Sequence, residues 1–535
     1  MNMLLLTTIV LIYLMIIAFL GYMGYRGTRN ATDYLVAGRK AHPLVMAISY
    51  GATFISTSAI VGFSGAAAVF GMGILWLTFL NIFAGIFIAF AIFGKRTRKM
   101  GHNLDAHTFP EFLGKRFDSP FLQMASGLLI FLAMPLYAGA VLIGGTQFLS
   151  ETLGINYEVA LMFFVAVVAM YVIMGGLKGV MYTDAFQGSI MFVGMALLLI
   201  FTYSKLGGVV PAHTALTALK GEAIKVFGPL GHQGWTSMPK AGSQFWWQLV
   251  TTIVMGVGIG VLAQPQLAVR FMTVRSNREL NRAVLIGGVF IFMMTGVAFI
   301  VGALSNVYFH GEMGKIAIAA VENKTDNIFP LYINMAMPGW FTAIFIVTLL
   351  AAAMSTLSSQ FHTMGSSFGR DFLESGFKIK TENSVMTNKI AMAVAILLSA
   401  FLAYFLPRFF EQGSAIIAIG TAIFFGLCAA TFLPMYFGAL YLKRFTRPAA
   451  LACFWSGLLT SLFWLVFVHV KESKPLGICK ALFGVDSLAA GSQLQNVDPI
   501  IIALPVSILF TVIFTLSTKP PKERILEKAF AGIKA

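Results

Sequence analysis

The sequence predicts an all-α integral membrane protein with about thirteen transmembrane helices. Of its 535 residues, 58% are hydrophobic and only 11% are charged, whereas ordinary soluble domains carry about 25% charged residues. The charged residues gather in short clusters between apolar runs of the length that a helix needs to cross a bilayer, about 20 residues. Because backbone polar groups inside the hydrocarbon must be satisfied within the segment, these runs are expected to be helical.

The apolar runs are long enough for thirteen spans, and they follow one another along the whole chain. We expect the spans at residues 4–22, 44–72, 73–94, 120–149, 156–175, 182–204, 246–269, 283–305, 330–366, 390–407, 412–441, 448–470 and 499–518. The first run is expected to be a span rather than a signal peptide, because no basic residue precedes its apolar stretch.

The net charge of +16 indicates a membrane topology rather than a nucleic-acid-binding surface. If the N-terminus lies outside the cell, alternate loops and the C-terminal tail are cytoplasmic. Most of the 37 Lys and Arg residues, Arg270 among them, then fall in cytoplasmic segments, as the positive-inside rule requires. We therefore expect a protein of the cell membrane with its C-terminus in the cytoplasm and no nucleic-acid partner.

The motifs of several enzyme classes are missing from the sequence. It has no phosphate-binding glycine loop, which an ATP-driven pump would need, and no nucleophile elbow, which a membrane-bound hydrolase would need. Its three cysteines stand far apart, without metal-ligand spacing. The protein is therefore not expected to be an enzyme.

The second and seventh spans are unsuited to continuous helices. Residues 47–65 mix glycines with many Ser and Thr residues, and residues 255–269 contain glycines and Pro265, which lacks an amide N–H and clashes with the preceding turn. The two spans stand five apart, as corresponding members of two five-helix units would. Such a pair points to a midplane binding site in inverted-repeat transporters, although small residues also pack helices closely in many membrane bundles.

The ninth span carries four hydroxyl residues close together. Ser355 and Ser359 lie one helical turn apart, and Thr356 and Ser358 flank them. A single serine in a membrane helix commonly bonds back to the carbonyl four residues earlier, whereas four together favour a polar lining. Hard cations prefer oxygen ligands, and hydroxyl groups supply them without adding charge, so this face suits sodium.

Asp184, at the start of the sixth span, is the carboxylate least easily explained as a loop residue. A carboxylate inside the membrane is costly and is a functional candidate with a partner. Two interpretations are open. Asp184 is either an interfacial helix N-cap just after the basic loop at Lys178, or it is satisfied by a nearby cation.

These residues resemble the sodium:solute symporter family, which includes sodium-coupled proline, pantothenate, sialic acid, monocarboxylate and glucose transporters. The similarity extends from about residue 30 to residue 445 and rests on several motifs in the same order. They are Asp33-Tyr34 followed by Gly38-Arg39, Gly51-Ala52-Thr53-Phe54-Ile55-Ser56, Gly175-Gly176, Tyr182-Thr183-Asp184, Gln187-Gly188 and Ala352-Ala353-Met354-Ser355-Thr356-Leu357-Ser358.

The resemblance implies the leucine-transporter-type 5+5 inverted repeat, with one extra helix before the core and two after it. Residues 1–535 would then form a single transmembrane transporter domain. Within it, 1–43 would hold the first helix and a cytoplasmic loop, 44–205 the first five-helix repeat, 244–441 the second, and 442–535 two C-terminal helices and a cytoplasmic tail.

The resemblance also implies sodium ligands. A main site would take hydroxyl oxygens from Ser355 and Thr356 and backbone carbonyls from Ala52, Ile55 and Ala352. Some members have a second site, which would fall here on Asp184, Ser355, Ser358 and Ser359, so that one or two sodium ions would be co-transported. Other members carry an aspartate where Phe54 stands here, and its role cannot be transferred.

The solute pocket is expected beside the broken helices. The candidate lining residues are Ser56, Thr57, Ala59, Trp76, Asn81, Tyr137, Gln264, Thr421 and Phe424, and ordinary packing is an alternative for each. Sialic acid carriers have a carboxylate-clamping arginine where Tyr137 stands. The pattern from Ile143 to Glu151 is closest to that of pantothenate-type and monocarboxylate-type members.

The preferred hypothesis is therefore sodium-coupled import of a small organic acid, a monocarboxylate or a pantothenate-like compound, by alternating access. We expect a monomer that interacts with the solute, sodium and membrane lipid. The alternatives are a proton-coupled symporter of a proline-like amino acid or a sugar, with Asp184 as the titrating group, and a non-transporting membrane sensor or channel.

Overall fold

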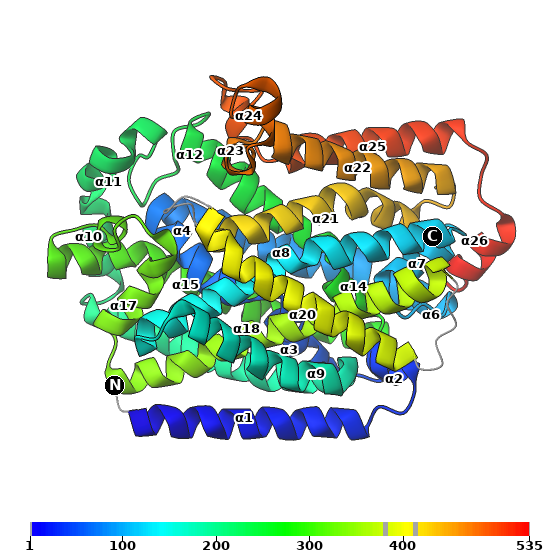
Figure 1. Cartoon of the computed structure of the whole chain (residues 1–535), viewed down its shortest axis with the longest axis horizontal. Helices are drawn as coiled ribbons and strands as arrows, with labels where there is room; N and C mark the ends of the chain where they lie inside the picture. Colours follow the sequence, from blue (N-terminus) through cyan, green and yellow to red (C-terminus); the bar gives the residue numbers. More distant parts are fainter. Residues whose placement is uncertain (1–2, 378–383, 410–415, 534–535) are drawn as a thin grey trace.

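The computed structural model describes residues 3–377, 384–409 and 416–533, and within these residues the regular structure is helical. Figure 1 shows the long helices running side by side along the longest axis of the molecule. They are α1 (Met3–Arg26), α8 (Pro120–Leu153), α9 (Tyr157–Lys205), α15 (Asn277–Met313), α18 (Gly339–Ser366), α20 (Ser384–Phe409), α21 (Ile416–Tyr441), α22 (Arg447–Phe467) and α25 (Ile500–Ser517).

Shorter helices complete the broken spans and the connections between spans. They are α2 (Ala31–Val36), α3 (Pro43–Phe54), α4 (Phe63–Phe70), α5 (Leu75–Ile82), α6 (Lys95–Asn103), α7 (Phe109–Arg116), α10 (Val209–Ala218), α11 (Lys220–Phe227), α12 (Gln244–Trp247), α13 (Gly258–Gly260), α14 (Pro265–Phe271), α16 (Ala317–Ala320), α17 (Ile328–Ala336), α19 (Ser375–Phe377), α23 (Val470–Leu476), α24 (Ile478–Phe483) and α26 (Glu523–Phe530).

The predicted spans all fall on helices. Eleven helical stretches in the described residues are long and apolar enough to cross a membrane, and two shorter apolar helices, Pro43–Phe54 and Tyr157–Met170, account for the remaining segments. Residues 412–415, at the start of the predicted span 412–441, lie outside the described part of the chain. The all-α, multi-span fold class predicted from the apolar runs is therefore confirmed.

Two glycines divide long helical stretches into separate spans. The chain from Ser58 to Asn103 turns at Gly71, whose φ of +77° is readily adopted only by glycine and whose missing Cβ makes room for the backbone of Trp235. Helix α9 breaks at Gly176, where φ is +56° and ψ is −177°. These breaks separate the second span from the third and the fifth from the sixth.

The second and seventh spans are interrupted, as predicted. Helix α3 ends at Phe54, Ile55 is extended, and helical structure resumes through a π-helical turn at Ser58–Gly62 that leads into α4. In the seventh span the chain is extended at Gln264, and Pro265 then takes the first position of α14. Proline suits that position because it lacks the N–H that would have no partner there.

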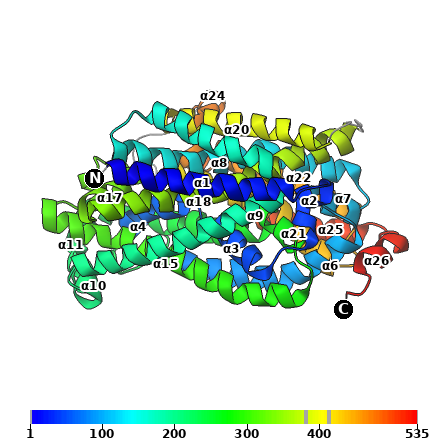
Figure 2. The same ribbon diagram turned by 90° about the horizontal axis from the view of Figure 1, so that it is seen from below.

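Helix α18 lies at the centre of the bundle. In its most apolar stretch 94% of the residues are buried, compared with 17% in that of α1. It packs against α9, α8, α20 and α3. Figure 2 shows α1 lying across α9 and α18 on the outside of the bundle. Helices α22 and α25 pack against each other at the opposite edge, as Figure 1 shows. The hydroxyl residues of the ninth span are therefore held in the interior.

Candidate sodium and solute site

The five oxygen atoms expected at the main sodium site converge where α3 ends against the middle of α18. The Ser355 hydroxyl lies 2.9 Å from the carbonyl oxygen of Ala52 and 3.2 Å from that of Ala352. The Thr356 hydroxyl lies 3.4 Å from the carbonyl oxygen of Ala52 and 3.3 Å from that of Ile55. All five residues are buried.

The break after α3 explains why backbone oxygens are available there. The last four carbonyl groups of an α-helix have no partner within the helix, and the C-terminal end carries partial negative charge. The Thr356 hydroxyl also lies 3.2 Å from the carbonyl oxygen of Thr53. The result is a buried cluster of uncharged oxygens of the kind that hard cations prefer.

Asp184 lies in the interior of α9, well beyond the break at Gly176, so the N-cap interpretation is wrong. Its carboxylate accepts hydrogen bonds from Ser49 at 2.9 Å and Ser358 at 3.2 Å. Ser359 lies 3.4 Å away. The alternative interpretation, a nearby cation, is correct: the guanidinium of Arg270 lies 2.8 Å from Asp184 Oδ2.

Arg270 is 1% exposed and belongs to α14, the second half of the broken seventh span. Its assignment to a cytoplasmic loop from the charge pattern was therefore wrong. The positive-inside argument treats each basic residue after an apolar run as a loop residue. The one sequence signal for its burial is that Arg270 directly follows the predicted span 246–269 and stands one helical turn after Gln266 of that span.

The four residues expected at a second sodium site are brought together. Ser358 and Ser359 contact Asp184, and their hydroxyls lie 3.0 Å and 3.2 Å from the backbone carbonyl oxygen of Ser355. The Ser355 hydroxyl is directed instead to Ala52 and Ala352 at the main site. Ser355 therefore takes part in both clusters, with its hydroxyl in the main one and its carbonyl oxygen in the second.

A small cavity of about 20 Å³, room for roughly one water molecule, lies beside the break in the second span. Five of the expected solute residues line it, namely Ser56, Ala59, Asn81, Tyr137 and Thr421. The sequence did not indicate the remaining lining residues as part of the solute pocket. They are Phe54, Ile55, Phe63, Leu77, Val257, Thr295, Phe299 and Phe425. The cavity is therefore mainly aromatic and aliphatic, with a few hydroxyl and amide groups.

The other four expected solute residues lie outside this cavity. Trp76 is 55% exposed and packs on Phe79. The Thr57 hydroxyl donates to the carbonyl of Val141 at 2.7 Å, and the Gln264 side chain donates to the carbonyl of Gly260 at 3.3 Å. Phe424 stacks on Tyr137 and leaves the lining position to its neighbour Phe425. For these four residues, packing is the better interpretation.

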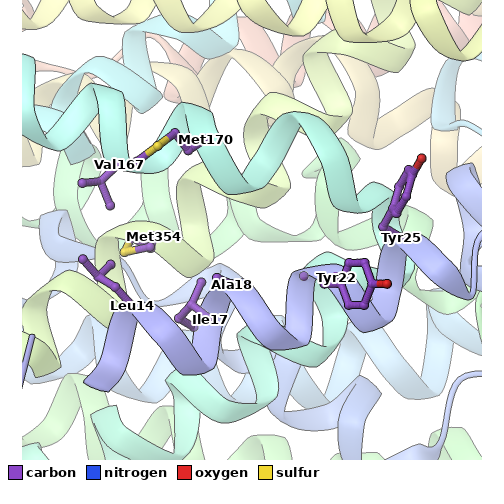
Figure 3. A pocket seen from close by; sticks show the side chains of 9 residues that line it. Leu14, Ile17, Ala18, Tyr22, Tyr25, Val167, Met170 and Met354 are labelled. Carbon is purple, nitrogen blue, oxygen red and sulfur yellow. The ribbon is translucent and has the colours of Figure 1, made fainter. Parts of the chain in front are cut away.

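A second, apolar groove of about 300 Å³ lies between α1 and α9, shown in Figure 3. Leu14 and Ile17 of α1 and Val167 and Met170 of α9 line it, and Tyr22 lies farther along α1. Met354, next to Ser355 in the chain, lines the inner side of the groove. The groove contains none of the expected sodium or solute residues, so it is separate from the candidate site.

The comparison with protein families agrees with this geometry. The family model described as the sodium:solute symporter family matches residues 34–457. The chain belongs to the sodium:solute symporter family. It is therefore a sodium-coupled solute symporter and a multi-pass membrane protein, and not an enzyme. Solute and sodium are its transported substrates.

The similar curated proteins differ in the solute that their names give. The osmoregulated proline transporter OpuE of Bacillus subtilis is 27% identical over 484 residues, which cover 89% of this symporter and 90% of OpuE. The sodium/proline symporter of Staphylococcus aureus is 26% identical and covers 92% of this symporter and 89% of its own length. The sodium/pantothenate symporter of Haemophilus influenzae is 28% identical over 70% of this symporter and 72% of its own length.

Solved structures confirm the predicted leucine-transporter-type fold. A Na+-coupled sialic acid symporter in a substrate-bound, outward-open state matches with a TM-score of 0.71 at 19% identity, over 97% of this symporter and 98% of that chain. Mhp1, a nucleobase-cation-symport-1 family transporter, matches with a TM-score of 0.53 at 13% identity, over 94% and 99% of the two chains.

Proposed function

We propose that this symporter imports a small organic acid together with sodium by alternating access. The observation that carries the proposal is the chemistry of the cavity beside the broken second span. The residues that line it supply aromatic and aliphatic surface, hydroxyl groups and the amide of Asn81, but no charged side chain. A small solute with an apolar body and one anionic group fits such a lining.

The anionic group would be held by backbone N–H groups rather than by an arginine. Helical structure resumes at Ser58 after the extended residue Ile55, and the first N–H groups of a helix have no partner within it. These groups carry partial positive charge and favour a carboxylate. In transporters with broken helices, the N-terminal ends of half-helices point at anionic groups of the substrate.

Sodium would bind at the main cluster of Ala52, Ile55, Ala352, Ser355 and Thr356. Ile55 belongs to both places, because its carbonyl faces the Thr356 hydroxyl and the residue also lines the cavity. A cation that orders this segment would therefore raise the affinity for the solute, and by linkage the solute would raise the affinity for sodium. An inside-negative potential adds about 2.3 kcal/mol per inward unit charge per 100 mV.

A proline-like amino acid is the second candidate for the solute. It is favoured by two similar proteins that are named as proline transporters and match about nine-tenths of the chain. Proline also combines a carboxylate with a small apolar ring. A sugar fits less well, because the cavity offers few hydrogen-bonding groups for its size. Membership of a sodium-coupled family argues against the proton-coupled symporter and against the sensor or channel.

The remaining sequence-based expectations stay proposals. We propose that the N-terminus lies outside the cell and the C-terminal tail in the cytoplasm, as the distribution of basic residues predicts. We also propose that residues 44–205 and 244–441 form the two five-helix repeats and that the monomer is the functional unit.

A thermal-shift screen of the purified protein tests the function. Monocarboxylates, pantothenate, proline and sugars are added in sodium chloride or in potassium chloride, and the unfolding temperature is recorded. A ligand that binds the folded state raises the unfolding temperature by mass action. We expect stabilisation by a carboxylate solute in sodium only. Stabilisation by sugars but by no carboxylate would refute the proposed solute class, and equal stabilisation in potassium would refute the coupling.

A further inference from the structure

We propose that Arg270 acts as a built-in cation at Asp184, so that it takes the place of a second sodium ion and the symporter carries one sodium ion per cycle. The inference deepens the proposed function and rests on the main sodium site at Ser355 and Thr356. It concerns the second cluster of oxygens, about one helical turn farther along α18.

The guanidinium of Arg270 contacts two of the oxygens expected at the second sodium site, Asp184 Oδ2 and the Ser359 hydroxyl, and two further hydroxyls, those of Thr53 and Ser49. Its Nη2 lies 2.8 Å from Asp184 Oδ2, 2.5 Å from the Thr53 hydroxyl and 2.6 Å from the Ser359 hydroxyl. Its Nε lies 3.2 Å from the Ser49 hydroxyl. Short distances from Nη2 are typical of charge-assisted hydrogen bonds, of which its two N–H groups can donate two at a time.

Charge balance is the second argument. Asp184 is fully buried and carries one negative charge when ionised, and Arg270 supplies one positive charge at contact distance. The other described hydrogen-bond partners of Asp184 are all hydroxyl groups. They belong to Ser49, Thr53, Ser358 and Ser359. A sodium ion added to the same oxygens would place two cations against a single carboxylate in a region of low dielectric constant, where like charges repel strongly.

Arg270 is also fixed in place by its own helix. Its Nη1 donates to the carbonyl of Gln266 at 2.8 Å, one turn earlier in α14. The side chain is therefore held between the second half of the seventh span and the first half of the second span, which contributes Ser49 and Thr53. A permanent cation that belongs to the chain cannot dissociate into the cytoplasm as a co-transported ion does.

Thr53 connects the two cation positions. Its hydroxyl contacts Arg270 and Asp184, and its carbonyl oxygen lies 3.2 Å from the Thr356 hydroxyl at the main site. Arg270 therefore acts as a positioning residue for the end of α3, where the carbonyls of the main site lie. In this arrangement the second cluster organises the first without binding an ion of its own.

Counting sodium ions bound to the purified full-length protein tests the inference without knowledge of the solute. Equilibrium binding of radioactive sodium is measured at saturation in detergent. We expect one ion per chain for the wild type, and in Ser355→Ala a higher sodium concentration for half-saturation of that site. Arg270→Gln removes the built-in cation and leaves Asp184 with its hydroxyl groups, so we expect bound sodium to double to two ions per chain. The double variant Arg270→Gln, Asp184→Asn is expected to return to one.

Several outcomes would overturn the role of Arg270. They are two sodium ions per wild-type chain, one ion whose affinity falls in Ser358→Ala but not in Ser355→Ala, or no additional ion in folded Arg270→Gln. Absence of sodium binding to the wild type would instead refute the proposed main site, so the two failures are distinguishable. If Arg270→Gln does not fold, the number of sodium ions bound per wild-type chain still tests the inference. Arg270→Lys keeps a cation at this position, so we expect it to bind one sodium ion per chain.

Discussion

The hydroxyl of Ser355 lies 2.9 Å from the backbone carbonyl of Ala52, a residue 303 positions earlier in the chain. This contact joins the middle of α18 to the end of α3. The carbonyl of Ala52 has no partner within its own helix because the second span breaks at Ile55. The hydroxyl of Ser355 can reach it because α18 is buried inside the bundle. The broken second span and the hydroxyl-rich ninth span thus meet at one place.

Replacing Ser355 with alanine is expected to weaken sodium binding. The variant removes one oxygen from the main cluster and leaves the Ala52 carbonyl without this donor. Loss of a buried polar partner costs about 1–3 kcal/mol, so sodium affinity should fall by about tenfold or more. The measurement is the sodium concentration that gives half-maximal binding.

Ser399→Ala is the matched control for this prediction. Ser399 is also buried in a long helix, but its hydroxyl donates to the carbonyl of Ala395 within α20. We expect its sodium affinity to equal that of the wild type. Unchanged affinity in Ser355→Ala would contradict the assignment of the main site.

The cavity predicts that substitutions at two residues of α5 differ in their effect on solute affinity. Asn81 is buried and lines the cavity, whereas Trp76 is more than half exposed. We expect Asn81→Ala to lower solute affinity by about fivefold or more, because a hydrogen-bonding group in the pocket is worth about 1 kcal/mol or more. Trp76→Ala should leave solute affinity unchanged. Solute-dependent thermal stabilisation in sodium measures both, and an equal effect of the two variants would argue against this cavity.

Close packing of two helices predicts a stability difference between two glycines of α15. A Cβ on Gly302 would overlap the backbone of Ser64 in α4, whereas a Cβ on Gly296 would meet no atom within 4 Å. Overpacking of a tight contact costs about 1–3 kcal/mol. We expect Gly302→Ala to lower the unfolding temperature in detergent and Gly296→Ala to leave it unchanged or raise it. The reverse order would show that α4 and α15 are not in close contact.

Outside the spans, Glu111 of α7 predicts a pH dependence of stability. Burial disfavours its charged form, but His107, Arg370 and Lys115 outweigh that effect and hold the pKa of Glu111 well below its usual range. A lowered pKa means that the ionised form stabilises the fold above the ordinary value of about 4.3, and that this stabilisation is lost as the pH falls through the folded-state pKa.

We therefore expect Glu111→Gln to lower the free energy of unfolding by about 3 kcal/mol between pH 6 and 8, as removal of one partner of a buried ion pair does. The difference from the wild type should narrow as the pH falls below about 4.3. Unfolding temperatures of the variant and the wild type, recorded over a series of pH values, measure this difference in stability. Glu222→Gln, which removes an exposed partner of Lys225, is the control and should have no measurable effect. A loss of stability in Glu111→Gln that becomes larger at acidic pH would contradict the lowered pKa of Glu111.

The fold was predictable because each of its main features has a local cause. Apolar length determines the spans, Pro265 marks the break in the seventh, and the mixture of glycine and hydroxyl residues around Ile55 marks the break in the second. The hydroxyl-rich face of the ninth span, from Ser355 to Ser359, was likewise visible in the local sequence, whereas its pairing with the carbonyls of Ala52 and Ile55 was implied by the resemblance to the family. Sodium binding there stays a prediction.

The second cluster and the pocket could not be predicted from local sequence. Arg270 follows an apolar run and looks like a loop residue until the folded chain places it against Asp184. Trp76 and Asn81 are five positions apart, about 140° around a helix, and only the packing of α5 decides which of them faces inward. The same holds for Phe424 and Phe425, of which only Phe425 lines the cavity. Which residue faces inward depends on packing against residues that are far away in the sequence.

The small size of the cavity has a consequence for the entry of the solute. Its volume of about 20 Å³ accommodates about one water molecule. A carboxylate solute is several times larger than this space. The aromatic side chains that line it, Phe54 and Phe425 among them, would therefore have to move apart before such a molecule could occupy it.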